Sequence, residues 1–209
     1  MASSRTSAVR EGRRERRSRE LREHIYRTAR ALFLEHGFEN TTVAQIADAA
    51  DIAQATFFNH FQSKAAVLQA MTAEVFEHLE ALVGEQLGRD ASAQDRISAF
   101  AAHVAEQIHE VPRLAHDVLL GLMQMGMRSG EVAPHLARLR DPFVAMLREG
   151  QARGEVRKDL DAIILAEVVI GALNAAVTGW LGDSDYPLRD RLHEIAAFMG
   201  EAISAVPRT

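Results

Sequence analysis

The segment that most constrains the fold of this 209-residue chain is residues 41–61. Its apolar residues recur at helical spacing on both sides of a break at residues 51–53, which is too short for anything but a tight turn. Thr42 and Gln45 form a capping box that starts the first helix, and Phe57 marks the second. Two short helices joined in this way predict a helix-turn-helix, whose second helix can enter the major groove of DNA.

The polar side of that second helix holds the candidate DNA contacts. Gln54 and Asn59 can each pair bidentately with adenine, and the methyl group of Thr56 can contact thymine. The small side chain of Ala55 lets the backbone approach the bases. We therefore expect these four residues, with His60 beside them, to face DNA.

Apolar residues recur at helical spacing through the rest of the chain as well. A first helix extends from about Leu21 to Gly37, where the glycine ends it. The alternative is that this helix begins inside the arm before it, where Glu15 and Arg19 form a favourable i,i+4 pair. Beyond Ser63 the pattern predicts longer helices, and no stretch alternates with the period of a strand. The predicted fold class is all-α, with about nine helices in an N-terminal three-helix domain and a C-terminal helical domain.

Charge is distributed unevenly along the chain, whose net charge is −5. Residues 1–64 hold eleven Lys and Arg against eight Asp and Glu, whereas residues 65–209 hold thirteen against twenty-one. A basic front on an acidic body is expected where one end of a protein meets phosphates. We predict a flexible Arg-rich arm (1–18), a helix-turn-helix DNA-binding domain (19–64) and a helical regulatory, ligand-binding and dimerisation domain (65–209). The arm is either a DNA contact or a solvated tail.

Several classes of protein are disfavoured. The chain has no cysteine, and its arginine-rich N-terminus is unlike a signal peptide, so a cytoplasmic protein with no membrane partner is expected. Glu106 and His109 form one E-x-x-H spacing, but a di-iron bundle needs two such motifs and two further glutamates. We expect no metal site and no other cofactor. No Ser-His-acid set or glycine-rich phosphate loop indicates an enzyme.

From residue 42 to residue 64 the chain reads T-V-A-Q-I-A-D-A-A-D-I-A-Q-A-T-F-F-N-H-F-Q-S-K, preceded by F-L-E-H-G-F at residues 33–38. These segments resemble the end of the first helix and the helix-turn-helix of the tetracycline-repressor (TetR) family of bacterial regulators. The resemblance covers about residues 20–68. It implies a transcriptional regulator, usually a repressor, that binds a palindromic double-stranded DNA operator as a homodimer and is released by a small-molecule ligand.

The same resemblance assigns roles to individual residues. It implies that Thr42, His60 and Lys64 contact DNA phosphates, and that the groove is faced by Gln54, Ala55, Thr56 and Asn59. Phe58 also stands at a DNA-contacting position, but it replaces a tyrosine whose hydroxyl meets a phosphate.

Two further positions depart from the family pattern. Asp51 stands in the turn where the family has glycine, and aspartate tolerates the left-handed backbone better than most residues. Ala53 replaces an N-capping serine, which should weaken the start of the second helix by about 1 kcal/mol.

The C-terminal domain gives weaker signals for an effector pocket. A small apolar or amphipathic effector is expected to bind between about Leu79 and Trp180. The candidate lining residues are Phe100, His103, Met123, Met127, Phe143 and Met146. The alternative is that the methionines fill gaps in the core.

The last two helices are the predicted dimer interface, as they are in the family. The helix over residues 162–181 is apolar around much of its circumference, which requires burial on more than one side. The alternative is that both helices only complete the core of one protomer. The predicted interface residues are Gly171, Ala175 and Gly179 in one helix, and Leu192, Ile195, Met199 and Ile203 in the other.

Two other functions remain open at this stage. One is a helix-turn-helix regulator without small-molecule input. The other is an enzyme built on the helical bundle, for which no complete catalytic set can be assembled. The size of the C-terminal domain favours ligand sensing, because dimerisation alone needs far fewer residues.

Overall fold

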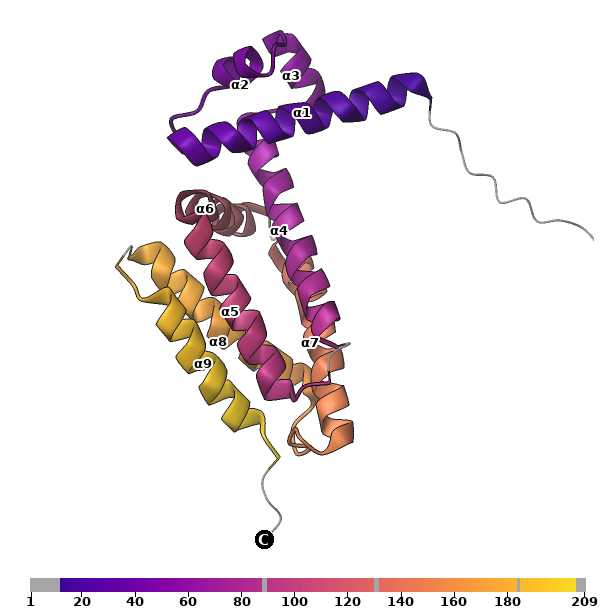
Figure 1. Ribbon diagram of the computed structural model, residues 1–209, viewed down its shortest axis with the longest axis vertical. Helices are drawn as coiled ribbons and strands as arrows, with labels where there is room; N and C mark the ends of the chain where they lie inside the picture. Colours follow the sequence, from indigo (N-terminus) through magenta and orange to yellow (C-terminus); the bar gives the residue numbers. More distant parts are fainter. Residues whose placement is uncertain (1–11, 88–89, 130–131, 184, 206–209) are drawn as a thin grey trace, which may run out of the picture. The chain divides into compact units, whose positions relative to one another are not determined.

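The structure is a computed structural model that describes residues 12–87, 90–129, 132–183 and 185–205, without the side chains of residues 87 and 122–138 (Figure 1). The described residues form nine α-helices and no strand, which confirms the predicted fold class. The chain divides into two compact units, which meet in sequence between Val67 and Leu68.

The first unit contains α1 (Arg13–His36), α2 (Val43–Ala49), α3 (Gln54–His60) and the first turn of α4 (Lys64–Leu87). Its core includes fully buried side chains from α1, α2 and α3, namely Ile25, Ala29, Phe33, Ile46, Ala47 and Phe57. Gly37 ends α1 with a φ of 82°, a left-handed conformation that favours glycine, and its N–H bonds the carbonyl of Phe33.

Helix α1 begins inside the segment predicted as an arm. The helix begins at Arg13, so residues 13–18 are helical and do not belong to a flexible arm. Glu15 accounts for part of this difference, because its carboxylate accepts a 3.0 Å hydrogen bond from the N–H of Gly12 at the helix start. The rest of the predicted arm, residues 1–11, lies outside the described residues.

The second unit contains the rest of α4 and five further helices. They are α5 (Ala93–Glu110), α6 (Pro112–Ser129), α7 (Val132–Arg153), α8 (Ala162–Gly182) and α9 (Leu188–Ile203). Ser92 caps α5 and Asp161 caps α8, since each side chain accepts a backbone N–H of the first turn. An isolated antiparallel bridge joins Val156 to Ser204.

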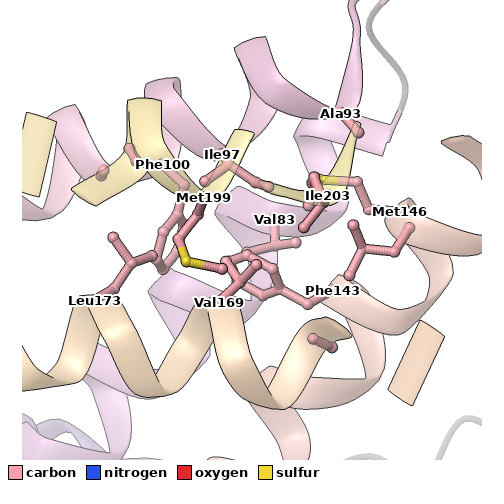
Figure 2. Packing of buried hydrophobic residues seen from close by; sticks show 14 of the residues in the cluster. Val83, Ala93, Ile97, Phe100, Phe143, Met146, Val169, Leu173, Met199 and Ile203 are labelled. Carbon is pink, nitrogen blue, oxygen red and sulfur yellow. The ribbon is translucent and has the colours of Figure 1, made fainter. Parts of the chain in front are cut away.

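A single apolar cluster fills the second unit (Figure 2). The rings of Phe100 and Phe143 meet edge to face with centroids 5.1 Å apart, which joins α5 to α7. Val169 from α8 and Met199 from α9 point into the same cluster. Burial of these large side chains, at about 25 cal/mol per Å² of apolar area, is the main stabilising contribution to this unit.

Arg96 is the charged residue that is buried among the described side chains of this unit. Arg96 on α5 is only 1% exposed, and its Nη1 donates to Oε2 of Glu149 on α7 over 2.8 Å. Hydrogen bonding to Arg96 holds the pKa of Glu149 below its usual value, and the nearby Arg153 lowers this pKa further. The pair ties α5 to α7 beside the apolar cluster.

Helix α8 is long and apolar enough to cross a membrane by length and composition alone. Its buried residues face its own unit, where α8 packs against α7 and α9. A core helix of an all-helical domain has the same composition, so this property does not by itself indicate a membrane span.

Candidate nucleic-acid interface

The N-terminus of α2 is capped as the sequence predicts. Thr42 Oγ1 accepts the N–H of Gln45 at 3.2 Å, and Gln45 Oε1 accepts the N–H of Thr42 at 2.8 Å. The two residues satisfy each other's backbone donors, which fixes the entry of the chain into α2. The side chain of Thr42 is exposed at this helix start.

The turn between α2 and α3 has the backbone that the sequence implies. Asp51 has a φ of 53°, and among the described non-glycine residues it is the one with positive φ. Ala53 is the N-cap of α3, and its side chain cannot accept a hydrogen bond from the helix. The turn therefore forms without glycine, and α3 begins without the side-chain cap that serine would supply.

Helix α3 has one buried side and one open side. Phe57 is fully buried, whereas Gln54, Ala55 and Asn59 are exposed. Phe58 is 51% exposed, although phenylalanine is among the residues most often fully buried. The residues half-buried at the edge of this surface are Thr56 and His60.

Arg22 on α1 holds the end of α3 in place. Its Nη1 donates to the carbonyl of His60, and its guanidinium lies over the ring of Phe61 at 4.0 Å from the centroid. A cation at a helix C-terminus satisfies the last carbonyls and interacts favourably with the helix dipole. Sequence reasoning missed this role, because it counted Arg22 only as part of the basic charge.

Lys64 also has internal partners that sequence reasoning missed. Its ammonium donates to the carbonyls of Phe38, Glu39 and Thr41 at 2.7, 3.2 and 3.0 Å, and it lies 4.3 Å from the centroid of the Phe38 ring. Three bonds use all three protons of a lysine. Lys64 thus fastens the loop before α2 to the first turn of α4, and its predicted phosphate contact stays a prediction.

The first two turns of α1 carry the strongest positive charge of the described chain. Residues 12–20 are all exposed. The arginines among them are Arg13, Arg14, Arg16, Arg17 and Arg19. An exposed helix of this composition can place several cations against phosphates.

The residues predicted to line a pocket have mixed outcomes. Phe100, Phe143 and Met146 lie inside the apolar cluster of the second unit, where they act as core residues (Figure 2). His103 is half-buried, and its Nε2 lies 3.0 Å from Nε2 of His78. The side chains of Met123 and Met127 lie outside the described residues. A lining role stays a prediction for this set.

The predicted dimer strip is wrong for three of its four residues in α9. Leu192, Met199 and Ile203 are buried in their own chain, because this side of α9 packs against α5 and α8. Ile195 is half-buried. Phe198 is a large apolar residue of α9 that is exposed, at 67%.

The small residues predicted for the interface in α8 also differ in exposure. Gly171 and Ala175 are exposed, and a Cβ added at Gly171 would meet nothing within 4 Å. Gly179 is half-buried, and a Cβ added there would lie 2.9 Å from the ring of Tyr186, so its place in a dimer interface stays a prediction.

Comparison with known proteins places the first unit in a family. Residues 25–71 match the model of the bacterial regulatory proteins of the tetR family. The transcriptional regulator TcmR of Streptomyces glaucescens is 30% identical over 154 residues, which are 72% of this chain and 67% of TcmR. The transcriptional repressor DhaR of Mycobacterium sp. (strain GP1) is 28% identical over 165 residues, 75% of this chain and 80% of DhaR.

The whole fold also has a solved counterpart. The crystal structure of the transcriptional regulator FadR from Bacillus subtilis, in complex with stearoyl-CoA, matches with a TM-score of 0.70 at 21% identity, over 87% of this chain and 98% of FadR. The family match, the TcmR relationship and the helix-turn-helix geometry agree. This chain belongs to the tetR family and is a DNA-binding transcriptional regulator, not an enzyme.

Proposed function

We propose that this regulator is a repressor that binds a near-palindromic operator as a homodimer and releases it when a small apolar or amphipathic effector binds. The observation that carries the proposal is the open side of α3 on a unit whose turn, caps and core already have helix-turn-helix geometry. A rigid unit loses little conformational entropy when it binds DNA.

Base reading is assigned to the exposed side of α3. Gln54 and Asn59 pair with base edges, while Ala55 and Thr56 allow close approach and apolar contact. Phe58 has no hydroxyl for a phosphate, so its exposed ring contacts a thymine methyl group or a sugar.

Phosphate contacts come from the surface around α3. Thr42 lies at the N-terminus of α2 and His60 at the C-terminus of α3, and the arginines of residues 13–19 extend the positive surface. Lys64 is left out of this set, because its three protons are donated to carbonyls. Phosphate contacts fix position, and base contacts choose the site.

The homodimer is assigned to the exposed side of α8. Ile164 and Val168 are about half exposed, and with Gly171 and Ala175 they follow one another at i, i+4, i+7 and i+11, which is one side of a helix. Phe198 of α9 adds a large exposed ring. An apolar stripe of this length is stable in water when a second copy covers it under a two-fold axis.

A two-fold dimer sets the operator geometry. Its two α3 helices enter successive major grooves about 34–36 Å apart, so the operator is an inverted repeat. DNA as partner places the protein in the cytoplasm, with the apolar side of α8 against a second copy and not in a membrane.

The effector site is assigned to the second unit, with His103 as its described candidate. FadR of Bacillus subtilis, which has the same fold, was solved with stearoyl-CoA, an amphipathic molecule of the class expected here. Acyl-CoA thioesters are therefore the first effectors to test.

Selection of operators from a random DNA pool tests the proposal. We expect enrichment of an inverted repeat with half-sites about one helical turn apart. Gln54→Ala and Asn59→Ala should each relax base preference at defined positions by about 1–3 kcal/mol. Equal losses on selected and scrambled DNA would contradict the assignment of the reading surface.

Effector response is tested on the selected operator. Addition of stearoyl-CoA or shorter acyl-CoA thioesters should weaken operator binding, with free coenzyme A as the control. If no amphipathic compound releases the operator, the protein is a regulator without small-molecule input of this class.

A further inference from the structure

Two histidines from different helices meet in the second unit. His78 lies on α4 and His103 on α5, and their Nε2 atoms are 3.0 Å apart. Their ring centroids are 5.2 Å apart with an interplanar angle of 42°, so the rings are tilted and meet at their edges, not stacked face to face. At this distance both nitrogens cannot carry a proton, because two N–H groups would then point at each other.

This arrangement is close to that of two histidines bound to one metal ion. With Zn–N distances of about 2.0–2.1 Å and tetrahedral angles, two coordinating nitrogens lie about 3.3 Å apart. The observed Nε2 atoms need to separate by only about 0.3 Å to reach that value. Unprotonated imidazole nitrogen is also the ligand that zinc and neighbouring transition metals prefer.

Access and charge favour a cation here. His78 is exposed and His103 half-buried, so an ion can reach both nitrogens from solvent. Glu74 and Glu77 lie on the same stretch of α4, and residues 65–209 hold more Asp and Glu than Lys and Arg. An excess of negative charge raises the local concentration of cations.

We propose that His78 and His103 form a two-histidine site for a divalent transition-metal ion such as zinc, which joins α4 to α5. Within the described residues no third His, Asp or Glu completes a metal-binding group. Water, or a donor atom of a bound molecule, therefore occupies the remaining positions of the ion. Sequence analysis predicted no metal site, because it found one E-x-x-H spacing alone, and it missed this pair because two histidines 25 residues apart form no motif.

A metal ion bound at this site would affect the stability of α4. This helix is continuous from the first unit into the second, and the metal ties its middle to α5. The bound ion should therefore reduce local opening of α4. His103 is also a candidate for the effector site, but zinc binding and its effect on α4 are measured without operator or effector, so their outcome is distinguishable from that of the proposed function.

Zinc titration of the tag-free, metal-stripped full chain by calorimetry tests the proposal. We expect one zinc ion per chain, no binding of Mg²⁺, which prefers oxygen ligands, and a loss of zinc affinity of roughly tenfold or more in His78→Ala and in His103→Ala. His109→Ala, an exposed histidine also on α5, is the matched control and should bind zinc as the parent does.

Hydrogen exchange supplies the second readout. Zinc should slow exchange of the α4 amides around His78 in the parent and in His109→Ala, but not in the His78→Ala/His103→Ala double variant. A parent that binds no zinc, or a folded double variant that binds zinc as tightly as the parent, would show that the two rings only share a hydrogen bond.

Discussion

The two units of this regulator are each stabilised internally by a different kind of interaction. In the first unit, polar side chains bond the backbone at the ends of its short helices: Thr42 with Gln45 at α2, Arg22 at the end of α3, and Lys64 at the loop before α2. In the second unit, one apolar cluster drawn from α4, α5, α7, α8 and α9 provides most of the packing.

This difference separates two tasks. Side-chain bonds to the backbone fix the shape of the first unit with few residues, and they leave the outer side of α3 exposed. The second unit buries large side chains and leaves apolar residues exposed on one side of α8. The first unit is therefore suited to reading DNA, and the exposed side of α8 is the surface that we propose joins two copies.

The largest expected effect comes from disrupting the proposed dimer interface on α8. Val168→Arg places a charge on the exposed side of α8 and should give a folded monomer, measured by light scattering. Operator affinity should then fall by about 10²–10⁴-fold, because each half-site loses its tethered neighbour. Leu120→Arg, at an exposed apolar position of α6, is the control and should remain dimeric. A dimeric Val168→Arg protein would place the interface elsewhere.

The next effect is a pH dependence specific to the second unit. The pKa of Glu149 is lowered by its hydrogen bond to Arg96, so the pair stabilises the fold above the ordinary glutamate value of 4.5 and loses this contribution as pH falls through the lower folded pKa. Glu149→Gln should lower the free energy of unfolding at pH 7, measured in urea, and the difference from the parent should shrink towards pH 3.

Asp159→Asn is the matched control for this pH effect. The pKa of Asp159 is also lowered, by Arg157, but that pair lies at the surface. Surface ion pairs contribute little, so Asp159→Asn should change stability less than Glu149→Gln at pH 7. Equal effects of the two substitutions would mean that burial of Arg96 adds nothing to the pair.

Much of the first unit was readable from sequence because several of its determinants are local. The capping box at Thr42, the positive φ at Asp51 and the missing cap at Ala53 each depend on residues within four positions of one another. Arg22 and His60 are 38 residues apart, and no local pattern could have paired them.

The second unit was readable only as a set of helices. Leu192, Met199 and Ile203 form an apolar stripe in α9, but a stripe does not say whether its partner is the same chain or a second copy. The same ambiguity applied to Phe143 and Met146, which pack in the core. The pairs His78–His103 and Arg96–Glu149 join different helices and became visible only when the helices were packed.

A smaller effect, on stability, tests whether the ammonium of Lys64 bonds within the first unit or contacts DNA phosphates. Lys64→Met keeps the apolar stem and removes three hydrogen bonds to carbonyls, so it should destabilise this unit by about 2–3 kcal/mol, measured by thermal unfolding. The salt dependence of operator binding should stay unchanged. Lys158→Met, at an exposed lysine of the second unit, is the control.

The opposite result for Lys64 has a clear meaning. An unchanged melting temperature, with a salt slope reduced by about one per chain, would restore the phosphate contact implied by the family resemblance.

The smallest effect concerns the uncapped start of α3. Ala53 already has the extended backbone of an N-cap, with φ −69° and ψ 147°, so Ala53→Ser can place a hydroxyl oxygen near the first N–H groups of the helix without moving the chain. We expect the free energy of unfolding of the first unit to rise by up to about 1 kcal/mol in urea. Ala49→Ser, at an exposed position inside the end of α2, should give no gain, because serine is a weaker helix former than alanine. If both variants have the same stability, the first N–H groups of α3 already have other hydrogen-bond partners. The missing side-chain cap would then not limit the stability of the first unit.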